Sequence, residues 1–337
     1  MGSITNTDYS KRYRFLVCLD GSDESYRGLR YAARLGKGVD ADIVLLYIRS
    51  IDRSLSYDRL RDSPKGDSLL AWGDEVPGVS YLEKGRNLLV ELGVMSMDWS
   101  EEIEHVPVAG DPVGDNKVVY QSEEGKMVVL KLKVASDIAT GILDQTKIKD
   151  YDLVILGAAD TWRDSNLIGF WDSSMIDKVV KEAPCSVLVA RDLEIGHGHL
   201  IYTDGSDRAT DVVRADAVLA SRCQCPVSLI SVAADESKEV EARRHVENAK
   251  VMLSSLGIEV RDTLTPVGDP VKEIVEAGPD YSLIVVSDTG VSGLQRFFMG
   301  SVTLKVLKEA HNSVMIVRGS MLIIAKGLSL RAQTLIA

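Results

Sequence analysis

The sequence predicts two α/β domains in tandem, each built on a doubly wound parallel sheet. Short β-branched, apolar segments such as 14–20 and 281–287 alternate with helical segments, which is typical of parallel strands covered by helices on both faces. The order of these segments is the same in the two parts of the chain, so the same unit occurs twice. A chain of 337 residues is long enough for two such domains.

Four pairs of matching segments, in the same order, establish the repeat. They are RFLVCLDGSDES (14–25) with HLIYTDGSDRA (199–209), AGDP (109–112) with VGDP (267–270), YDLVILG (151–157) with YSLIVVS (281–287), and KVVKEAPCSVLVAR (178–191) with KVLKEAHNSVMIVR (305–318). We therefore place the first domain at 11–192 and the second at 198–318. The segment RDLEIGHGH (191–199) is predicted to be a linker rather than a metal site, and 319–337 is a tail outside the repeat.

Residues typical of helix ends predict the bounds of several helices. In the first unit, strand 14–20 leads to a helix with Ser22 as its N-cap and Gly36 or Gly38 as its stop, and then to strand 41–50. Asp269 is predicted to cap a helix whose first residue is Pro270. The second unit is predicted to contain strands 199–204, 226–233, 258–265, 281–287 and 313–318, and helices 207–222, 237–256, 270–277 and 301–311.

The first unit is longer than the second. Part of the excess is a polar segment near 50–80, and the rest follows AGDP at about 113–135. There, VVYQS and MVVLKLKV flank EEGK, which predicts a β-hairpin, and the next helix is predicted to restart at Asp137. Two interpretations of this insertion remain. It is a surface for packing or for a partner, or it is a plain loop added to the domain.

Composition restricts the partners and the compartment. The net charge of −11 argues against nucleic acid or an anionic membrane as the main partner. No run of 18 apolar residues predicts a membrane span, and the first residues do not resemble a signal peptide. The four cysteines lie mostly in apolar runs and form no zinc motif, which favours a reducing cytoplasm.

A ligand is expected at the carboxyl ends of the strands of the second unit. Asp204 follows the first strand there, and the glycine-rich stretch GVSGLQRFFMGSVT (290–303) follows strand 281–287. Glycines let backbone N–H groups approach a phosphate, and Gly300-Ser301-Val302-Thr303 begins a helix whose free N–H groups favour an anion. A carboxylate repels phosphate, so Asp204 is expected at the sugar or base end of the ligand.

These residues resemble the universal stress protein family, whose ATP-binding members carry G-x2-G-x9-G-[ST] after the fourth strand. The second unit has Ser287, Gly290, Gly300 and Ser301 at these positions, so Ser287 replaces the first glycine. The DGS turn, the VGDP turn and the final strand also match. The resemblance covers nearly the whole chain and implies two adenine nucleotide alpha hydrolase-like domains.

The resemblance also implies roles for individual residues. Thr203 and Asp204 lie at the adenosine end of ATP, and Val232 contacts the adenine ring. The phosphates, with or without Mg²⁺, are enclosed by the remaining motif residues, namely Ser287, Gly290, Gly300, Ser301, Val302 and Thr303. Arg296 is either a charge partner or a solvent-exposed arginine.

The first unit departs from this pattern. After Gly157, its loop is longer, Asp160 takes the place of the second glycine, and Ser173, preceded by Asp172, takes the place of Gly300. We therefore expect that the first unit does not bind ATP in the usual way. The aromatic side chains of Trp162, Phe170 and Trp171 are expected to fill its pocket or to contact something apolar, and Asp20 either keeps a ligand role or only caps the next helix.

The resemblance implies that the final strands, 186–190 and 313–317, pair antiparallel within one molecule. The apolar tail 319–337 is expected to pack on a sister domain or to drive a homodimer.

Three functions remain open from the sequence: an adaptor or regulator of the stress response that depends on ATP or another adenine nucleotide, a slow ATP hydrolase, and a scaffold in which both sites are relics. No residue suggests itself as a catalytic base.

Overall fold

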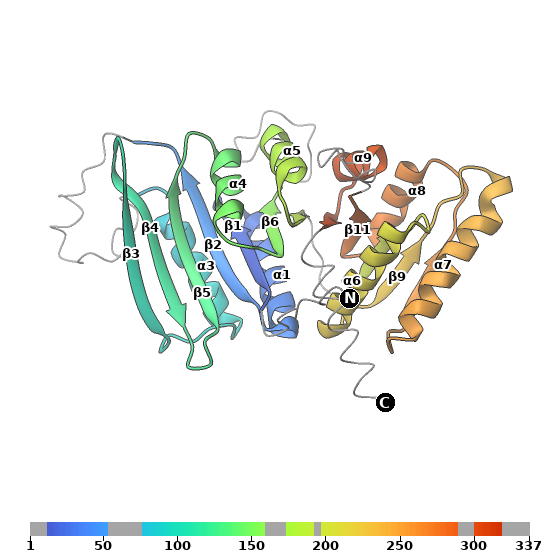
Figure 1. Ribbon diagram of the computed structural model, residues 1–337, viewed down its shortest axis with the longest axis horizontal. Helices are drawn as coiled ribbons and strands as arrows, with labels where there is room; N and C mark the ends of the chain where they lie inside the picture. Colours follow the sequence, from blue (N-terminus) through green and yellow to red (C-terminus); the bar gives the residue numbers. More distant parts are fainter. Residues whose placement is uncertain (1–11, 53–75, 159–172, 192–196, 289–299, 319–337) are drawn as a thin grey trace, which may run out of the picture.

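The computed structural model describes residues 12–52, 76–158, 173–191, 197–288 and 300–318 (Figure 1). Twelve strands in these residues form one sheet in the order β10-β9-β8-β11-β12-β7-β6-β1-β2-β5-β4-β3. We call the part of the chain up to β7 the first half and the part from β8 the second half. None of the helices in the described residues combines the length and apolar character needed to cross a bilayer.

The first half alternates strands and helices and contains the inserted hairpin. Its elements are β1 (Arg14–Cys18), α1 (Asp23–Val39), β2 (Asp42–Arg49), α3 (Val79–Glu91), β3 (Ser100–Val108), β4 (Asp111–Gln121), β5 (Met127–Val134), α4 (Ile138–Ile148), β6 (Leu153–Gly157), α5 (Ser173–Glu182) and β7 (Ser186–Ala190).

The second half repeats the alternation without the hairpin. Its elements are β8 (His199–Tyr202), α6 (Asp207–Arg222), β9 (Val227–Ile230), a 3₁₀ turn (Glu236–Lys238), α7 (Glu239–Ser254), β10 (Val260–Leu264), α8 (Pro270–Ala277), a 3₁₀ turn (Gly278–Asp280), β11 (Leu283–Ser287), α9 (Ser301–Glu309) and β12 (Ser313–Val317).

Both faces of the sheet are covered, as the uninterrupted apolar strands predict. One apolar core lies under α1, α3, α6 and α7, and the other lies under α4, α5, α8 and α9. Each core contains side chains from both halves, so neither core ends where the halves meet. The predicted doubly wound α/β fold is therefore confirmed.

Capping residues explain why several helix bounds agree with prediction. The Ser22, Ser206 and Asp137 side chains each accept a hydrogen bond from a backbone N–H in the first turn of the helix that follows. Asp269 caps α8, which begins at Pro270 as expected. The prediction that Gly36 or Gly38 stops α1 is wrong, because the helix continues to Val39 and ends at Asp40, which has a φ of 53°.

The predicted hairpin is confirmed as β4 and β5, which pair antiparallel around residues 122–126. Strand β5 also pairs parallel with β2, in the position that β10 takes beside β9 in the second half. Strand β3 is displaced to the edge of the sheet. The insertion therefore adds two strands to the sheet of the first half instead of forming a loop outside it.

The AGDP and VGDP turns match in sequence but differ in structure. Asp269 accepts hydrogen bonds from the N–H groups of Val271 and Lys272, whereas Asp111 is buried at the start of β4 and forms an ion pair with Arg49. The Arg49 Nη1 to Asp111 Oδ2 distance is 2.7 Å. Burial alone raises the pKa of Asp111, but Arg49 and backbone N–H groups outweigh it and hold this pKa below its usual value.

The halves meet through β7 and β12, which pair antiparallel with Met315 opposite Leu188. The last arginine of each repeat reaches into the other half. Arg191 donates to the carbonyl oxygens of Leu307 (2.6 Å) and Asn312 (3.2 Å) at the end of α9. Arg318 donates to those of Val180 (2.7 Å) and Ala183 (3.0 Å) at the end of α5. Each guanidinium therefore caps the C-terminus of a helix across the junction.

On the opposite face of the junction, three buried polar side chains form a chain of hydrogen bonds. The Asp216 carboxylate lies 2.8 Å from Nδ1 of His199, and the Tyr31 hydroxyl lies 2.6 Å from Nε2 of the same ring. His199 therefore begins β8 and is fully buried, and the expectation that it belongs to a linker is wrong. Burial alone lowers the pKa of His199, but the Asp216 carboxylate outweighs it and raises this pKa to about 9.

The two aspartates of the repeated turn should respond differently to the same substitution. Asp111→Asn leaves the buried Arg49 without its counter-charge, so we expect the free energy of unfolding to fall by about 3 kcal/mol or more. Asp269→Asn should change it by only about 0.5 kcal/mol, because asparagine is an equally good N-cap. Urea denaturation of both variants measures these values, and equal losses would contradict the assignment.

The buried histidine should make stability depend on pH. Because the folded pKa of about 9 exceeds the ordinary value of 6.5, the stabilisation is complete below pH 6.5 and is lost as pH rises through 9. We expect wild type to lose up to about 1.4 kcal/mol per pH unit over this window. Asp216→Asn should flatten the slope between about pH 6.5 and 8, before cysteine thiols titrate. Parallel urea titrations at several pH values compare the two proteins, and an unchanged slope would exclude this role for His199.

Candidate functional site

The candidate site lies where the strand order of the second half reverses. From β8 the chain proceeds to β9 on one side, whereas β11 and β12 lie on the other side. Ligands of open α/β sheets bind outside the carboxyl ends of the strands at such a point. Thr203 and Asp204 follow β8, and Ser287 ends its parallel neighbour β11, so these predicted residues lie at one edge of the sheet.

Helix α9 places its N-terminus at the same edge. Its N-cap is Gly300, which has no side chain, and within the described residues no side chain caps the first N–H groups of the helix. The Thr303 hydroxyl donates to the carbonyl oxygen of Ser287 at 2.7 Å, which ties the first turn of α9 to the end of β11. Thr303 is buried, Val302 packs against a core, and Ser301 is exposed.

Asp204 has a structural role in addition to any ligand role. Its Oδ1 accepts hydrogen bonds from the backbone N–H of Ser206 (3.0 Å) and from the Ser206 hydroxyl (2.6 Å), and Ser206 caps α6. Asp20 and Ser22 form the same arrangement in the first half, so Asp20 does cap the next turn. Asp204 is exposed, and its Oδ2 forms no hydrogen bond with any described residue, which leaves one carboxylate oxygen free.

The remaining predicted residues lie around this edge. Thr203 is buried, and its hydroxyl accepts a hydrogen bond from the N–H of Gly205 at 3.2 Å. Val232 lies two residues beyond β9 and is partly buried. Burial raises the pKa of Tyr202 to about 12, with a further contribution from Asp204, so the Tyr202 phenol is neutral at physiological pH.

An ion-pair network that no sequence pattern indicated lies beside β11. Asp288 lies 2.9 Å from Nε of Arg208 on α6 and 3.2 Å from Nε of Arg318 after β12. The two guanidinium groups offset the negative charge of the Asp288 carboxylate, which would otherwise repel an anion at the start of α9. The repeat aligns Arg318 with Arg191, and this match could have drawn attention to Arg318. Its pairing with Asp288 depends on the fold.

A histidine without recognisable sequence spacing also borders the site. The His245 ring lies against Gly205, where an added Cβ would be 2.2 Å from its Cδ2. In the first half the Tyr81 ring covers Gly21 in the same way, at 2.7 Å from such a Cβ. Tyr81 also contacts Tyr47, with 5.8 Å between ring centroids. The turn after the first strand is therefore covered by an imidazole in one half and by phenol rings in the other.

The end of the fourth repeated strand is packed more closely in the first half than in the second. A Cβ on Gly157, at the end of β6, would lie 2.5 Å from the backbone nitrogen of Ser25 in α1. The second half carries Ser287 at the equivalent position and accommodates its side chain in a buried place. Helix α1 therefore packs directly on the strand end, where the second half leaves room for a side chain.

Several predicted residues lie outside the described part of the chain. They are Gly290 and Arg296 of the second half, and Asp160, Trp162, Phe170, Trp171 and Asp172 of the first. Within the described part, no group of three or more His, Cys, Asp or Glu side chains could hold a metal ion.

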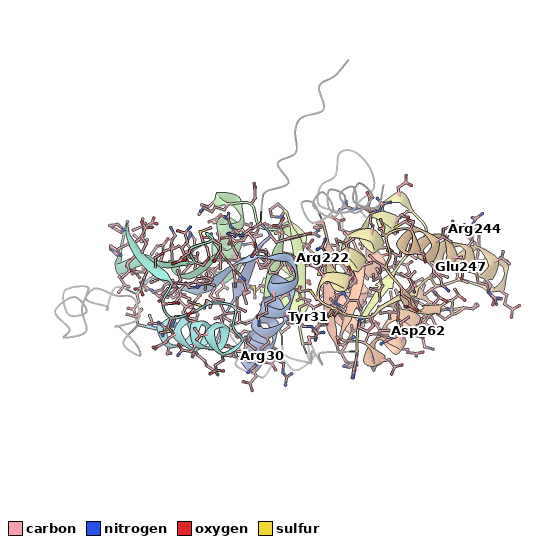
Figure 2. All side chains as sticks on the ribbon, turned by 90° about the horizontal axis from the view of Figure 1, so that it is seen from below. Arg30, Tyr31, Arg222, Arg244, Glu247 and Asp262 are labelled. Carbon is pink, nitrogen blue, oxygen red and sulfur yellow. The ribbon has the colours of Figure 1, made fainter. Side chains whose placement is uncertain are left out.

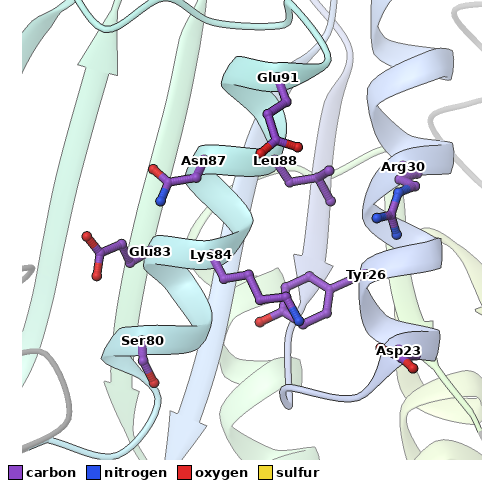
Figure 3. A pocket seen from close by; sticks show the side chains of 9 residues that line it. All are labelled: Asp23, Tyr26, Arg30, Ser80, Glu83, Lys84, Asn87, Leu88 and Glu91. Carbon is purple, nitrogen blue, oxygen red and sulfur yellow. The ribbon is translucent and has the colours of Figure 1, made fainter.

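A separate cavity of about 410 Å³ lies between α1 and α3 (Figure 3). Its lining combines three carboxylates, those of Asp23, Glu83 and Glu91, with the cations Arg30 and Lys84. The Lys84 ammonium lies 4.1 Å from the centre of the Tyr26 ring. Because the opposite charges offset one another, this cavity has no preference for a phosphate.

Comparison with known proteins agrees with this architecture. A model of the Universal stress protein family matches residues 12–74, 90–191 and 200–318. A universal stress protein of Methanocaldococcus jannaschii is 34% identical over 80 residues, which are 23% of this chain and 49% of that protein. One from Bacillus subtilis is 29% identical over 144 residues, covering 35% of this chain and 97% of the relative. The match therefore spans about half of the first relative and nearly all of the second.

Two solved structures share the fold over most of the chain. A functionally unknown protein from Pseudomonas aeruginosa PAO1 has a TM-score of 0.60 at 14% identity and covers 97% of this chain and 99% of its own. A universal stress protein from Archaeoglobus fulgidus has a TM-score of 0.57 at 13% identity and covers 90% and 98%. The protein is thus a doubly wound α/β protein with a repeated unit. It belongs to the universal stress protein family.

Exchanging the residue at the strand end should affect the halves unequally. Gly157→Ser forces α1 away from β6, so we expect the free energy of unfolding to fall by about 2 kcal/mol. Ser287→Gly removes a side chain without a collision and should cost about 1 kcal/mol or less. Thermal or urea unfolding of the two variants tests this difference. A Gly157→Ser variant as stable as wild type would contradict the close packing of α1 on the end of β6.

Proposed function

We propose that this chain is a stress-response protein that binds ATP, or another adenine nucleotide, in its second half and acts as a nucleotide-dependent adaptor or regulator. The observation that carries the proposal is the N-terminus of α9, which no side chain of the described residues caps and which the Thr303 hydroxyl fixes to the end of β11. Its backbone N–H groups and the helix dipole favour a phosphate at this position.

The other residues of the edge fit the rest of a nucleotide. The exposed carboxylate of Asp204 can accept hydrogen bonds from ribose hydroxyl groups through its Oδ2. Val232, at the end of the second strand, offers an apolar contact for the adenine ring. Gly300, Ser301, Val302 and Thr303 then lie at the phosphate end, together with Ser287 and Gly290. Mg²⁺, if required, would be held by the phosphates and water, as is usual for this ion.

The first half is proposed not to bind a nucleotide in this way. Gly157 lies against the backbone of α1, so this strand end has no room for a side chain such as that of Ser287 in the second half. We propose further that the halves are two domains, 11–192 and 198–318, in a cytoplasmic protein whose tail, 319–337, contacts a sister domain or a second copy.

Two other functions differ in measurable ways. A slow ATP hydrolase requires a group that orients water near the terminal phosphate. His245 borders the site, but its ring covers the Gly205 turn, near the end of β8, rather than the start of α9. A scaffold without nucleotide requires no open helix N-terminus, so the arrangement at Gly300 favours the nucleotide-dependent adaptor.

The test is a pair of equivalent substitutions. Gly300→Asp places a carboxylate at the proposed phosphate position, and we expect it to weaken ATP binding at least about tenfold. Ser173→Asp makes the same change at the matching position of the first half and should leave the affinity unchanged. Aspartate is a favourable residue at either helix start, so both variants should fold. Titration calorimetry with ATP measures the affinities, and melting temperatures confirm folding.

The outcomes separate the three functions. Equal binding by wild type and Gly300→Asp would contradict the proposed site, and no binding by wild type would favour the scaffold. Release of phosphate over hours by wild type but not by Gly300→Asp would favour the hydrolase. Mass spectrometry of nucleotide released from the denatured, purified protein identifies which adenine nucleotide the chain carries.

A further inference from the structure

A cavity of about 510 Å³ lies between α1 and α6, where the two halves meet, and we call it the seam pocket. Four of its lining side chains are basic: Arg30, Arg34 and Lys37 from α1, and Arg222 from α6. None of the described residues that line it is acidic. Figure 2 shows Arg30 and Arg222 near the middle of the molecule, and Arg244 far from them on α7.

Among the residues that the structure describes, no carboxylate pairs with the basic groups of the seam pocket. Arg34 donates a hydrogen bond to the carbonyl oxygen of Cys223 at 3.3 Å, which holds its guanidinium between the halves. In the part of the chain that the structure describes, Arg30, Lys37 and Arg222 form no ion pair. The chain has 50 acidic and 39 basic residues, so a pocket with four cations and no acid runs against its overall charge.

Helix dipoles account for only part of this charge. Lys37 and Arg222 lie in the last turns of α1 and α6, where cations interact favourably with the C-terminal carbonyl groups. Arg30 lies more than two turns before the end of α1, beyond the range of that effect. Arg30 also borders the cavity of Figure 3, which Glu91 lines from the facing helix α3. No ion pair joins Arg30 and Glu91 in the described residues.

The backbone geometry keeps the pocket together. A Cβ on Gly38 would lie 2.8 Å from the carbonyl oxygen of Arg222, so only a glycine lets the ends of α1 and α6 approach this closely. This approach holds like charges from the two halves around one cavity. Their mutual repulsion is relieved when an anion binds among them.

We propose that the seam pocket binds a small soluble phosphate ester or polyphosphate with at least two negatively charged groups. Guanidinium groups form paired, charge-assisted hydrogen bonds with phosphate oxygens, which suits them to this ligand. The net charge of −11 repels a long polyanion such as nucleic acid, whereas a short anion fits within the local positive field. Since residues of both halves contact it, the ligand would also strengthen the junction.

The experiment uses the full chain and tripolyphosphate as the probe, titrated calorimetrically at low salt. All variants carry Gly300→Asp, so that the phosphate position proposed at α9 does not contribute. We expect Arg30→Gln combined with Arg222→Gln to weaken tripolyphosphate binding at least about tenfold. Arg244→Gln removes an exposed arginine from α7 and should leave the affinity within about twofold. Tripolyphosphate should also raise the melting temperature of the parent and of Arg244→Gln, but not of the double variant.

Unchanged tripolyphosphate affinity in the double variant, or no binding by the parent, would overturn the proposal. Arg30 and Arg222 are exposed and form no ion pair with a described residue, so their replacement should not prevent folding. If the double variant melts early, Arg30→Gln alone provides the test, with an expected loss of about threefold or more. Tripolyphosphate binding that persists in Gly300→Asp but is lost when Arg30 and Arg222 are also replaced separates the seam pocket from the phosphate position proposed at α9.

Discussion

The antiparallel pairing of β7 with β12, fixed by two arginines that cross it, is the constraint on which the rest of the structure depends. Arg191 and Arg318 are buried, and each guanidinium satisfies carbonyl groups at the end of the other half's last helix. On the same face Lys308 lies 3.0 Å from Asp177, which joins α9 to α5. Because both apolar cores also continue through this junction, neither half has a complete core alone. The two repeats are therefore packed on each other through apolar cores that they share.

Within this frame, equivalent positions have acquired different roles. The aspartate of the AGDP and VGDP turns neutralises Arg49 in one half and caps a helix in the other. The end of the fourth repeated strand lies against α1 at Gly157 but has room for the Ser287 side chain. Of these two differences, the one at Gly157 and Ser287 leaves more room at the strand end of the second half. The asymmetry thus supports one binding site in a chain with two similar units.

The sequence predicted those features of the fold and of the candidate site that depend on residues close together in the chain. The starts of α1 and α8 followed from Ser22 and from Asp269 with Pro270, because an N-cap acts on the turn beside it. Asp204 and the start of α9 were expected at one edge because parallel strands end together, and the family resemblance added Thr203 and Ser287. By contrast, the contact of Asp288 with Arg208 and Arg318, and the burial of His199, join segments far apart in the chain. No local pattern reveals such pairs.

One contact between α1 and α6 explains what fusing the two units makes possible. Gly38 and Arg222 occupy the same place in the repeat, counted from the aspartate of each Asp-Gly-Ser turn, and they face each other. In a symmetric dimer of one such unit, both copies would carry the same residue at this position, and the two identical residues would face each other. Two glycines would supply no charge, and two arginines would collide. Covalent linkage removes the symmetry, so a small residue and a charged one can be matched across the junction.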